Sequence, residues 1–293
     1  MMKKIEQLKK LYNLRKNYNS NLGISFKDYY SLSQYSQHNQ VDLTVNFKNK
    51  PLSFSNPYWF LHSLEEIFID EVYQFKSDSL PHTIIDCGAN IGLSIIYLKN
   101  IFPNAHITGI EADEKIFNQL TRNLEPYNFN GVNLINAAAW VNDEGCTFVI
   151  DGSLGGHIKN DNSQDKTIHV KSLRLKNMIT SKIFFLKMDI EGAEYQVIKD
   201  IKDQLHFIEN LFIEFHVKHD EENHLDEILK WVKDAGFTYY IKEAWNVMNN
   251  PFTKKLTAKA GWFQSQLNIF CYTNERNQTL SSLSPSVPSH RDQ

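Results

Sequence analysis

The chain has 293 residues, 42% of them hydrophobic, which is enough for one large domain or two modest ones with a substantial core. The formal net charge of −3 and the pI of about 6.4 exclude a general affinity for nucleic acid backbones. The three cysteines form no CxxC pair, which excludes a disulfide framework and a thiolate zinc site and favours a reducing, cytoplasmic location.

Residues 1–80 are rich in aromatic side chains and indicate a mainly helical N-terminal extension that acts as a lid or in dimerisation. Four apolar residues near its start have helical spacing opposite a basic face: Ile5, Leu8, Leu11 and Leu14. They predict a surface helix that packs on its own domain or on a dimer mate, with an acidic membrane surface or partner as the alternative. Residues 41–47 alternate like a short strand, and residues 56–75 predict a helix with Ser55 or Asn56 as its cap and Pro57 at its first position.

Between residues 81 and 275, strand and helix patterns alternate regularly. Strands are expected at 83–88, 106–112, 132–140, 182–190 and 211–217, and helices at 92–102, 113–126, 191–201 and 221–236. Residues 146–151 and 167–173 predict an antiparallel excursion around a flexible loop at 152–166, and residues 237–245 and 267–274 predict a terminal antiparallel pair. This alternation specifies an α/β domain with a doubly wound, mostly parallel sheet. Residues 276–293 lack apolar periodicity and are expected to form a disordered tail.

The most informative segment is IIDCGANIG at residues 84–92. A buried strand that leads into a glycine turn and then a helix places backbone N–H groups and a helix N-terminus around one point. A small polar or charged ligand would bind there, and a plain packing turn is the structural alternative. Asn90 replaces the middle glycine of a dinucleotide-binding turn, so the turn favours a ligand without a pyrophosphate.

Two further segments follow the next two predicted strands. Glu111 lies 25 residues after Asp86 at the end of a strand, where a carboxylate accepts hydrogen bonds from ribose hydroxyls. The small side chains of NAAAW, at 136–140, leave a flat slot for an adenine ring, whose edge Asn136 or backbone groups could contact. Solvation of Glu111 and simple strand packing at 136–140 are the structural alternatives.

The segment LKMDIEGAEYQVI, at 186–198, ends a buried strand with Asp189 and Glu191. Two carboxylates at one strand end repel each other unless they are solvated, paired or used in function. Asp189 is expected in the crevice at the carboxyl end of the sheet, where open parallel sheets bind ligands. Glu191 could instead stabilise the N-terminus of the following helix.

Glu214 and His216, in IEFHV, are two residues apart and therefore lie on one face of a strand. His216 is our candidate general base, because a neutral imidazole is available near pH 7. A structural histidine is one alternative. A divalent ion held by Asp189, Glu214 and His216 is another, which we rank below direct base catalysis. We therefore predict Asp189, Glu191, Glu214 and His216 as catalytic residues, with no metal.

Together, IIDCGANIGLS, TGIEAD, NAAAW, LKMDIEGAEYQVI and LFIEFH resemble the FkbM family of S-adenosylmethionine-dependent methyltransferases over residues 82–245. The resemblance implies a class I methyltransferase, Rossmann-like fold with a seven-stranded, mostly parallel sheet. It implies methylation of a hydroxyl oxygen on a sugar, polyketide or similar small molecule, with S-adenosylmethionine as the cofactor. Cofactor contacts are expected from the glycine turn, Glu111 and the adenine slot: Asp86, Gly88, Ala89, Asn90, Gly92, Glu111, Ala112, Asn136 and Ala137.

Three other functions remain open from the sequence. One is a nicotinamide-dependent oxidoreductase or epimerase on the same architecture, and another is a non-catalytic adenosyl-binding partner subunit. Nucleic acid methylation is weaker, because the motif that presents a flipped base is missing and the charge is unsuitable. The expected partner is a small-molecule or glycan hydroxyl acceptor. No apolar run reaches the roughly 20 residues of a membrane span.

Overall fold

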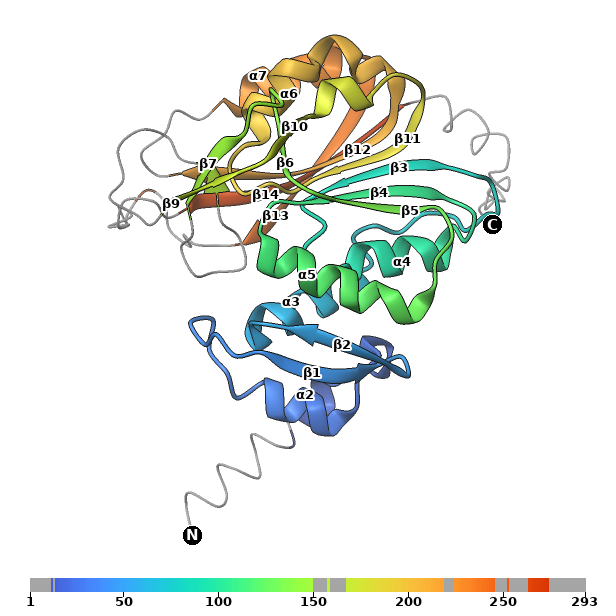
Figure 1. Cartoon of the computed structure of the whole chain (residues 1–293), viewed down its shortest axis with the longest axis vertical. Coiled ribbons are helices and arrows are strands. Elements are labelled where there is room, and N and C mark those ends of the chain that lie inside the picture. Colours follow the sequence, from blue (N-terminus) through green and yellow to red (C-terminus); the bar gives the residue numbers. More distant parts are fainter. Residues whose placement is uncertain are drawn as a thin grey trace, which may run out of the picture.

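Seven strands form the central sheet, in the order β13-β14-β12-β11-β3-β4-β5 (Figure 1). The computed structural model describes residues 12, 14–149, 157–158, 167–218, 224–245, 252 and 263–273. The strands are β3 (Thr83–Cys87), β4 (His106–Glu111), β5 (Val132–Asn136), β11 (Ile183–Met188), β12 (Ile208–Lys218), β13 (Phe237–Trp245) and β14 (Phe263–Thr273). Only the pairs that involve β14 are antiparallel. The predicted doubly wound, mostly parallel sheet and its terminal antiparallel pair are confirmed.

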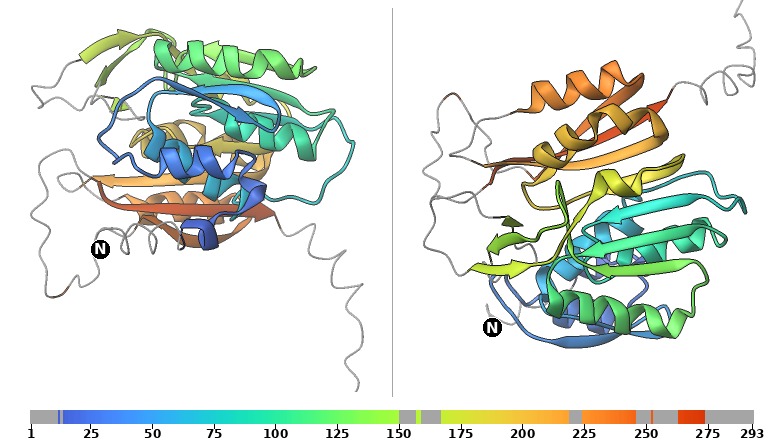
Figure 2. Two further views of the ribbon diagram at one scale, coloured as in Figure 1. Left: turned by 90° about the horizontal axis from the view of Figure 1, so that it is seen from below. Right: turned by 45° about the horizontal axis from the view of Figure 1, so that its top comes forward.

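The two central strands, β3 and β11, are buried along almost their whole length. Their continuous apolar runs are typical of parallel strands that are covered on both faces. Helices α4 (Leu93–Ile101) and α5 (Glu114–Leu124) cover one face, and α6 (Glu194–Ile201) and α7 (Leu225–Asp234) cover the other (Figures 1 and 2). Each face has its own apolar core. Because the central strands are parallel, their carboxyl ends lie along one edge of the sheet.

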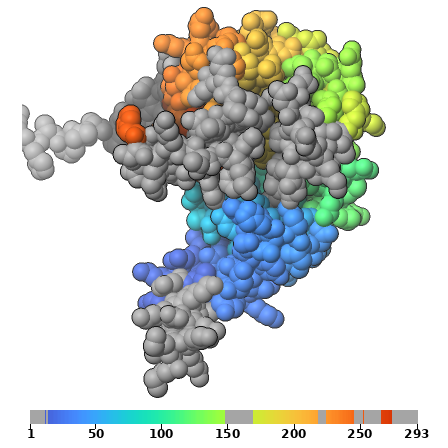
Figure 3. Space-filling model, turned by 90° about the vertical axis from the view of Figure 1, so that its left-hand side faces the viewer, coloured from blue at the N-terminus to red at the C-terminus, as the bar shows by residue number. Residues whose placement is uncertain are grey.

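The N-terminal part packs on the side of the molecule that α4 and α5 cover, and it shares their core. It consists of a short 3-10 helix (Ser20–Leu22), α2 (Phe26–Leu32), the hairpin β1 (Leu43–Phe47) and β2 (Lys50–Phe54), and α3 (Pro57–Phe68). Figure 3 shows this part in blue, directly against the cyan and green segments that follow it in the chain. Its role as a lid or in dimerisation stays a prediction.

Helix α3 begins as predicted and ends earlier. Asn56 caps it by accepting hydrogen bonds from the main-chain N–H groups of Tyr58 and Trp59. The helix stops at Phe68 rather than at residue 75, and Glu71 has a left-handed φ of 51°, which a helix cannot accommodate. Strand β2 was not predicted; it pairs with β1 across Lys48 and Asn49, whose positive φ angles suit a tight hairpin turn.

Two boundaries in the main domain also differ from prediction. Residues 132–140 form two strands, because the chain turns at Ala137 and β6 (Ala138–Trp140) pairs with β10 (Ser172–Arg174) outside the central sheet. Helix α6 starts at Glu194 rather than at residue 191, because Glu191 and Gly192 have left-handed φ angles of 56° and 96°.

The predicted antiparallel excursion is confirmed as a small sheet of β7 (Cys146–Val149), β8 (His157–Ile158) and β9 (Thr167–Val170). Further 3-10 helices lie at Glu125–Tyr127, Leu175–Met178 and Lys202–Phe207. The predictions for residues 1–11, for most of the loop 152–166 and for the tail 276–293 fall outside the described residues. None of the described helices is long and apolar enough to cross a bilayer.

Candidate active site

The carboxyl ends of β3, β4, β11 and β12 bring the predicted site residues to one edge of the sheet. The main chain joins these strand ends, because Gly88 N–H donates to Ile110 O at 3.0 Å and Asp189 N–H donates to Cys87 O at 3.1 Å. The glycine turn therefore lies between the end of β4, with Glu111, and the end of β11, with Asp189. This is the crevice in which open parallel sheets bind their ligands.

The glycine turn has a backbone that only its sequence allows. Gly88 has a φ of 83°, and a Cβ atom at this position would lie 1.9 Å from the main-chain oxygen of Asp189. Gly92, with a φ of 95°, is the N-cap of α4 and has no side chain to block the first turn of that helix. The N–H groups of residues 88–92 all donate within the chain, so the turn contributes its shape rather than free donors to a ligand site.

Glu111 organises the turn from the neighbouring strand. Its two carboxylate oxygens accept hydrogen bonds from the N–H groups of Asn90 and Asp113, both at 2.9 Å, and the residue is 9% exposed. A carboxylate has about four acceptor positions, so two remain for ribose hydroxyls. Burial raises the pKa of Glu111 to about 7, against the lowering effect of the two backbone hydrogen bonds. The residue fits the predicted ribose contact in both position and chemistry.

The raised pKa of Glu111 predicts a pH dependence of ligand binding. A ribose hydroxyl donates best to the ionised carboxylate, so below pH 7 a bound proton competes with the ligand. We expect S-adenosylhomocysteine to bind about tenfold more weakly at pH 6 than at pH 8, as measured by calorimetry. Glu111→Gln should bind weakly at both pH values, whereas exposed Glu114→Gln should keep the wild-type profile; an unchanged profile in Glu111→Gln would contradict the assignment.

Asp86 differs from the expectation of a direct cofactor contact. Its side chain is fully buried, accepts a hydrogen bond from Ser94 Oγ at 2.5 Å and lies 3.2 Å from Lys187 Nζ. Lys187, which the sequence analysis did not select, also donates to Gly88 O at 2.9 Å and lies 3.4 Å from Asp189 Oδ2. Burial alone would lower the pKa of Lys187, but Asp86 and Asp189 outweigh it and raise that pKa well above its usual value. Asp86 therefore stabilises the turn through Lys187, which it binds and which donates to Gly88 O. Its buried carboxylate does not face a ligand.

Asn136 and Ala137 also lie at the predicted edge, with their polar groups turned to the main chain. Asn136 Nδ2 donates to the main-chain oxygens of Glu111, at 2.9 Å, and Ala112, at 3.3 Å. The N–H of Ala137 donates to Glu111 O at 3.1 Å. These bonds fix the end of β4, so Asn136 does not use its amide nitrogen to contact an adenine edge as expected. The small, buried side chains of Ala137 and Ala138 remain compatible with a slot beside Glu111.

Asp189 is the most accessible carboxylate whose main chain touches the glycine turn. Its side chain is 26% exposed, and Lys187 holds one carboxylate oxygen. Because Asp189 O lies where a Cβ of Gly88 would be, any ligand in the turn is within reach of this strand end.

His216 is not the neutral base that we predicted. Its side chain is 1% exposed, with Nδ1 at 3.1 Å from Glu194 and Nε2 at 3.5 Å from Glu191 and 3.8 Å from Glu214. Burial alone would lower the pKa of His216, but Glu194 and Glu191 outweigh it and raise that pKa well above its usual value. Because both ring nitrogens lie beside carboxylates and the ring is buried, His216 is placed to hold these groups rather than to accept the proton of a substrate.

Glu194 is the residue that the sequence analysis missed here, although it lies within the quoted segment LKMDIEGAEYQVI. Fully buried, it accepts hydrogen bonds from the N–H groups of Ile190 and Gly192 and binds His216. Glu194 and His216 thus hold the loop that carries Glu191. As an alternative, we predicted that Glu191 stabilises the N-terminus of the following helix. In the structure, Glu194 is the acidic residue in the first turn of α6.

The alternative metal ligands also come together. One ligand atom from each of Asp189, Glu214 and His216 lies within 4.8 Å of the others, a spacing that could hold a metal ion. A metal would have to displace the proton from His216, whose pKa is raised, and compete with Lys187 for Asp189. The charges present therefore favour direct use of the carboxylates.

The profile of the methyltransferase FkbM domain matches residues 86–239, which is more than half of the chain and includes the glycine turn, Glu111, Asp189 and His216. The chain belongs to the FkbM methyltransferase family. Membership confirms the class I methyltransferase fold, methyl transfer as the activity and S-adenosylmethionine as the methyl donor. It removes the nicotinamide-dependent oxidoreductase from the alternatives.

Two curated relatives and one solved structure illustrate the similarity. Methyltransferase 1 of Beauveria bassiana (strain ARSEF 2860) is 27% identical over 185 residues, which are 53% of this chain and 72% of the relative. Methyltransferase sdnD of Sordaria araneosa is 38% identical over 60 residues, which are 20% of this chain and 23% of the relative. The crystal structure of methyltransferase FkbM from Methylobacillus flagellatus KT is 16% identical, and the match covers 90% of this chain and 59% of that one with a TM-score of 0.42.

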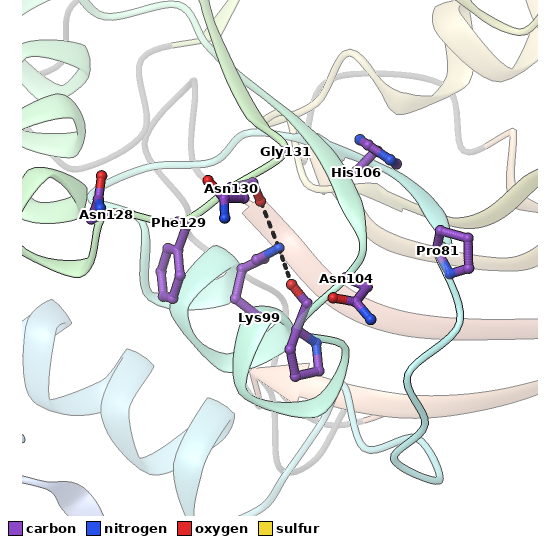
Figure 4. Close-up of a pocket in the computed structure, with 9 residues that line it drawn as sticks. Pro81, Lys99, Asn104, His106, Asn128, Phe129, Asn130 and Gly131 are labelled. Carbon is purple, nitrogen blue, oxygen red and sulfur yellow. Dashed lines mark hydrogen bonds between the residues drawn. The ribbon is translucent and has the colours of Figure 1, made fainter.

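A hollow at the opposite edge of the sheet is not part of the site of this FkbM-family methyltransferase. It is lined by residues that precede or begin β3, β4 and β5 and by the end of α4: Pro81, Lys99, Pro103, Asn104, His106, Asn128, Phe129, Asn130 and Gly131 (Figure 4). Lys99 Nζ donates to the main-chain oxygens of Pro103, Ala105 and Asn130, and Figure 4 marks two of these bonds. An ammonium has three N–H donors, so Lys99 has none left for a ligand.

Lys99 instead stabilises the fold. We expect Lys99→Met to lower the free energy of unfolding by about 3 kcal/mol, because buried carbonyl groups lose a charged donor, as measured by urea denaturation. Lys115→Met is the control, since the side chain of Lys115 is 63% exposed and pairs with the exposed Asp42. Its loss should stay below about 0.5 kcal/mol. Equal losses in the two variants would contradict this role of Lys99.

Proposed function

We propose that this methyltransferase transfers the methyl group of S-adenosylmethionine to a hydroxyl oxygen of a small molecule or saccharide. The observation that carries the proposal is the position of Asp189. The main-chain oxygen of Asp189 lies against Gly88, and its side-chain carboxylate is partly exposed. A hydrogen-bond acceptor therefore lies beside the turn that would bind the methyl donor. A carboxylate in that place suits an acceptor group that must lose a proton.

The residues of the site have separate tasks in this proposal. The turn from Gly88 to Gly92 would hold the methionine end of the donor, and Glu111 its ribose. When bound, S-adenosylmethionine supplies a methyl carbon on a sulfonium, whose C–S bond breaks as the new C–O bond forms, with the electron pair left on sulfur. The chain holds the three atoms in line, which can contribute several kcal/mol by proximity. The carboxylates at this edge also favour a cationic donor.

Asp189 is our choice for the base that receives the hydroxyl proton. Both ring nitrogens of His216 already lie beside carboxylates, so His216 has no accessible nitrogen to take it. Burial and the nearby Asp189 raise the pKa of Glu214 well above its usual value, which favours its hydrogen-bond-donating form over the ionised base. Glu191 and Glu214 would then orient the acceptor around Asp189.

The decisive experiment uses the purified chain, a small-molecule extract and donor labelled with deuterium in its methyl group. Mass spectrometry should find a labelled product, and NMR should place the label on oxygen. A label on nitrogen or carbon would overturn the hydroxyl assignment. Binding of S-adenosylhomocysteine without any transfer would favour the non-catalytic subunit. We place the reaction in a reducing, cytoplasmic environment, since Cys87, Cys146 and Cys271 are unpaired and buried.

A further inference from the structure

Helix α3 contributes one polar residue to the active-site edge, although it lies outside the segment that matches the family. Glu66 Oε1 accepts a hydrogen bond from Asn268 Nδ2 at 3.1 Å. Asn268 on β14 lies opposite Glu214 on β12, and residues directly opposite in an antiparallel pair share one face of the sheet. Asp189 acts electrostatically on both Glu66 and Glu214. Glu66 is therefore part of the same polar cluster as the proposed base.

The same face of α3 continues away from Glu66 with two rings. Trp59, His62 and Glu66 are spaced at i, i+3 and i+7, which places them on one side of the helix. All three are half-buried, and the rings of Trp59 and His62 contact each other at a centroid distance of 5.7 Å. The opposite side of α3, with Phe60, Leu64 and Ile67, packs in the core. An aromatic surface thus leads to a carboxyl group.

The charges along this face are unsuited to an anionic molecule. Glu66, Asp189, Glu191 and Glu214 bring four carboxyl groups to the edge. Among the described residues, the basic groups nearby are already engaged: Lys187 with Asp86 and Asp189, and His216 with Glu191, Glu194 and Glu214. A phosphate or carboxylate on the acceptor would meet repulsion without a charged partner.

The unused hydrogen-bonding capacity at this face indicates a methyl acceptor whose own groups donate hydrogen bonds. Asn268 is 1% exposed; its Nδ2 donates to Glu66, and its Oδ1 has no hydrogen-bond partner among the described residues. Buried polar atoms normally have a partner, which here would have to be a donor. Hydroxyl groups supply such donors, and the apolar face of a sugar ring can lie on an aromatic ring.

We propose that the face of α3 formed by Trp59, His62 and Glu66, with Asn268 and Glu214, is the acceptor subsite, and that it takes an uncharged, polyhydroxylated molecule of the sugar class. This inference rests on the proposed function, since it describes the acceptor of that reaction. It assigns acceptor choice to α3 and β14, which flank the matched residues 86–239 in the sequence.

The test measures acceptor binding apart from donor binding. The full chain, saturated with S-adenosylhomocysteine, is applied to an array of immobilised glycans that pairs neutral sugars with their uronic acid and phosphate counterparts. We expect binding to neutral members and at least tenfold weaker signals for their anionic counterparts. Binding to anionic members at equal strength, or to no glycan at all, would overturn the inference. Failure of the protein to bind S-adenosylhomocysteine by calorimetry would instead reject the proposed function.

Variants then locate the subsite on α3. Trp59→Ala and Glu66→Gln should each reduce glycan binding at least tenfold, with unchanged affinity for S-adenosylhomocysteine. Glu65→Gln is the matched control, because Glu65 is the exposed neighbour on the same helix and should keep wild-type binding. Thermal unfolding checks that each variant is folded. Equal glycan binding by Glu66→Gln and Glu65→Gln would show that the acceptor does not contact this face.

Discussion

Replacing Asp189 by asparagine is expected to lower kcat by about 10²–10⁴-fold, because the acceptor hydroxyl then has no base for its proton. The carboxamide keeps the size of the side chain, and the main-chain contact with Gly88 stays unchanged. The affinity for S-adenosylhomocysteine should therefore change little. The measurement combines methyl-transfer rates on the acceptor found in the extract with calorimetry of ligand binding.

Asp203→Asn is the control for this substitution, since the side chain of Asp203 is 74% exposed and lies 3.9 Å from Lys176. It should retain wild-type turnover. If Asp189→Asn keeps more than a third of the wild-type kcat, Asp189 is not the base. The remaining carboxylate candidate is then Glu191, whose side chain is 30% exposed, and Glu191→Gln would be examined in the same assay.

Replacing Gly88 by alanine is expected to cost about 3–5 kcal/mol of folding free energy and to abolish donor binding. The new methyl group would overlap the main-chain oxygen of Asp189 at 1.9 Å, and the φ of 83° is strained for any residue with a Cβ. The atoms that the methyl group would meet all belong to the main chain of Asp189 and cannot move aside as a flexible side chain could. The ends of β3 and β11 must therefore separate. Urea denaturation measures the loss of stability, and calorimetry measures the loss of ligand binding.

Gly236→Ala separates the overlap from the backbone strain. Gly236 has a similar φ of 91°, but an added Cβ would meet nothing within 4 Å. This variant should lose only about 1–2 kcal/mol, which is the cost of the left-handed conformation alone. If both alanine variants lose the same amount, the contact between the turn and Asp189 is not what requires glycine at position 88.

The sequence was sufficient to predict the layout of the domain and the edge at which the site lies. Parallel strands that alternate with helices must bring their carboxyl ends together, so Gly88, Glu111 and Asp189 could be placed near one another from their positions alone. The break at Ala137 was not predictable, because residues 132–140 contain no glycine or proline to mark the end of a strand. The pattern shows a strand, but not which sheet its second half joins.

The pairing of charges within the site was out of reach of the sequence. Lys187, in a buried strand, and Glu194, in a helix, have no local pattern that indicates their partners, which lie on β3 and β12. The raised pKa of His216 follows from the three carboxylates around it, and only the folded chain brings these together. Glu66 and Asn268 are separated by 202 positions, so their contact could not be anticipated from spacing.

The parallel pair β6–β10 joins the two ends of the segment between residues 141 and 171. Ala138 N–H donates to Lys171 O at 2.8 Å, so the chain departs from the main body and returns to it at adjacent points. A segment whose two ends are clamped together can lengthen, shorten or change composition while the strands on either side keep their register. Evolution can therefore exchange this module for another without redesigning the scaffold that binds the methyl donor.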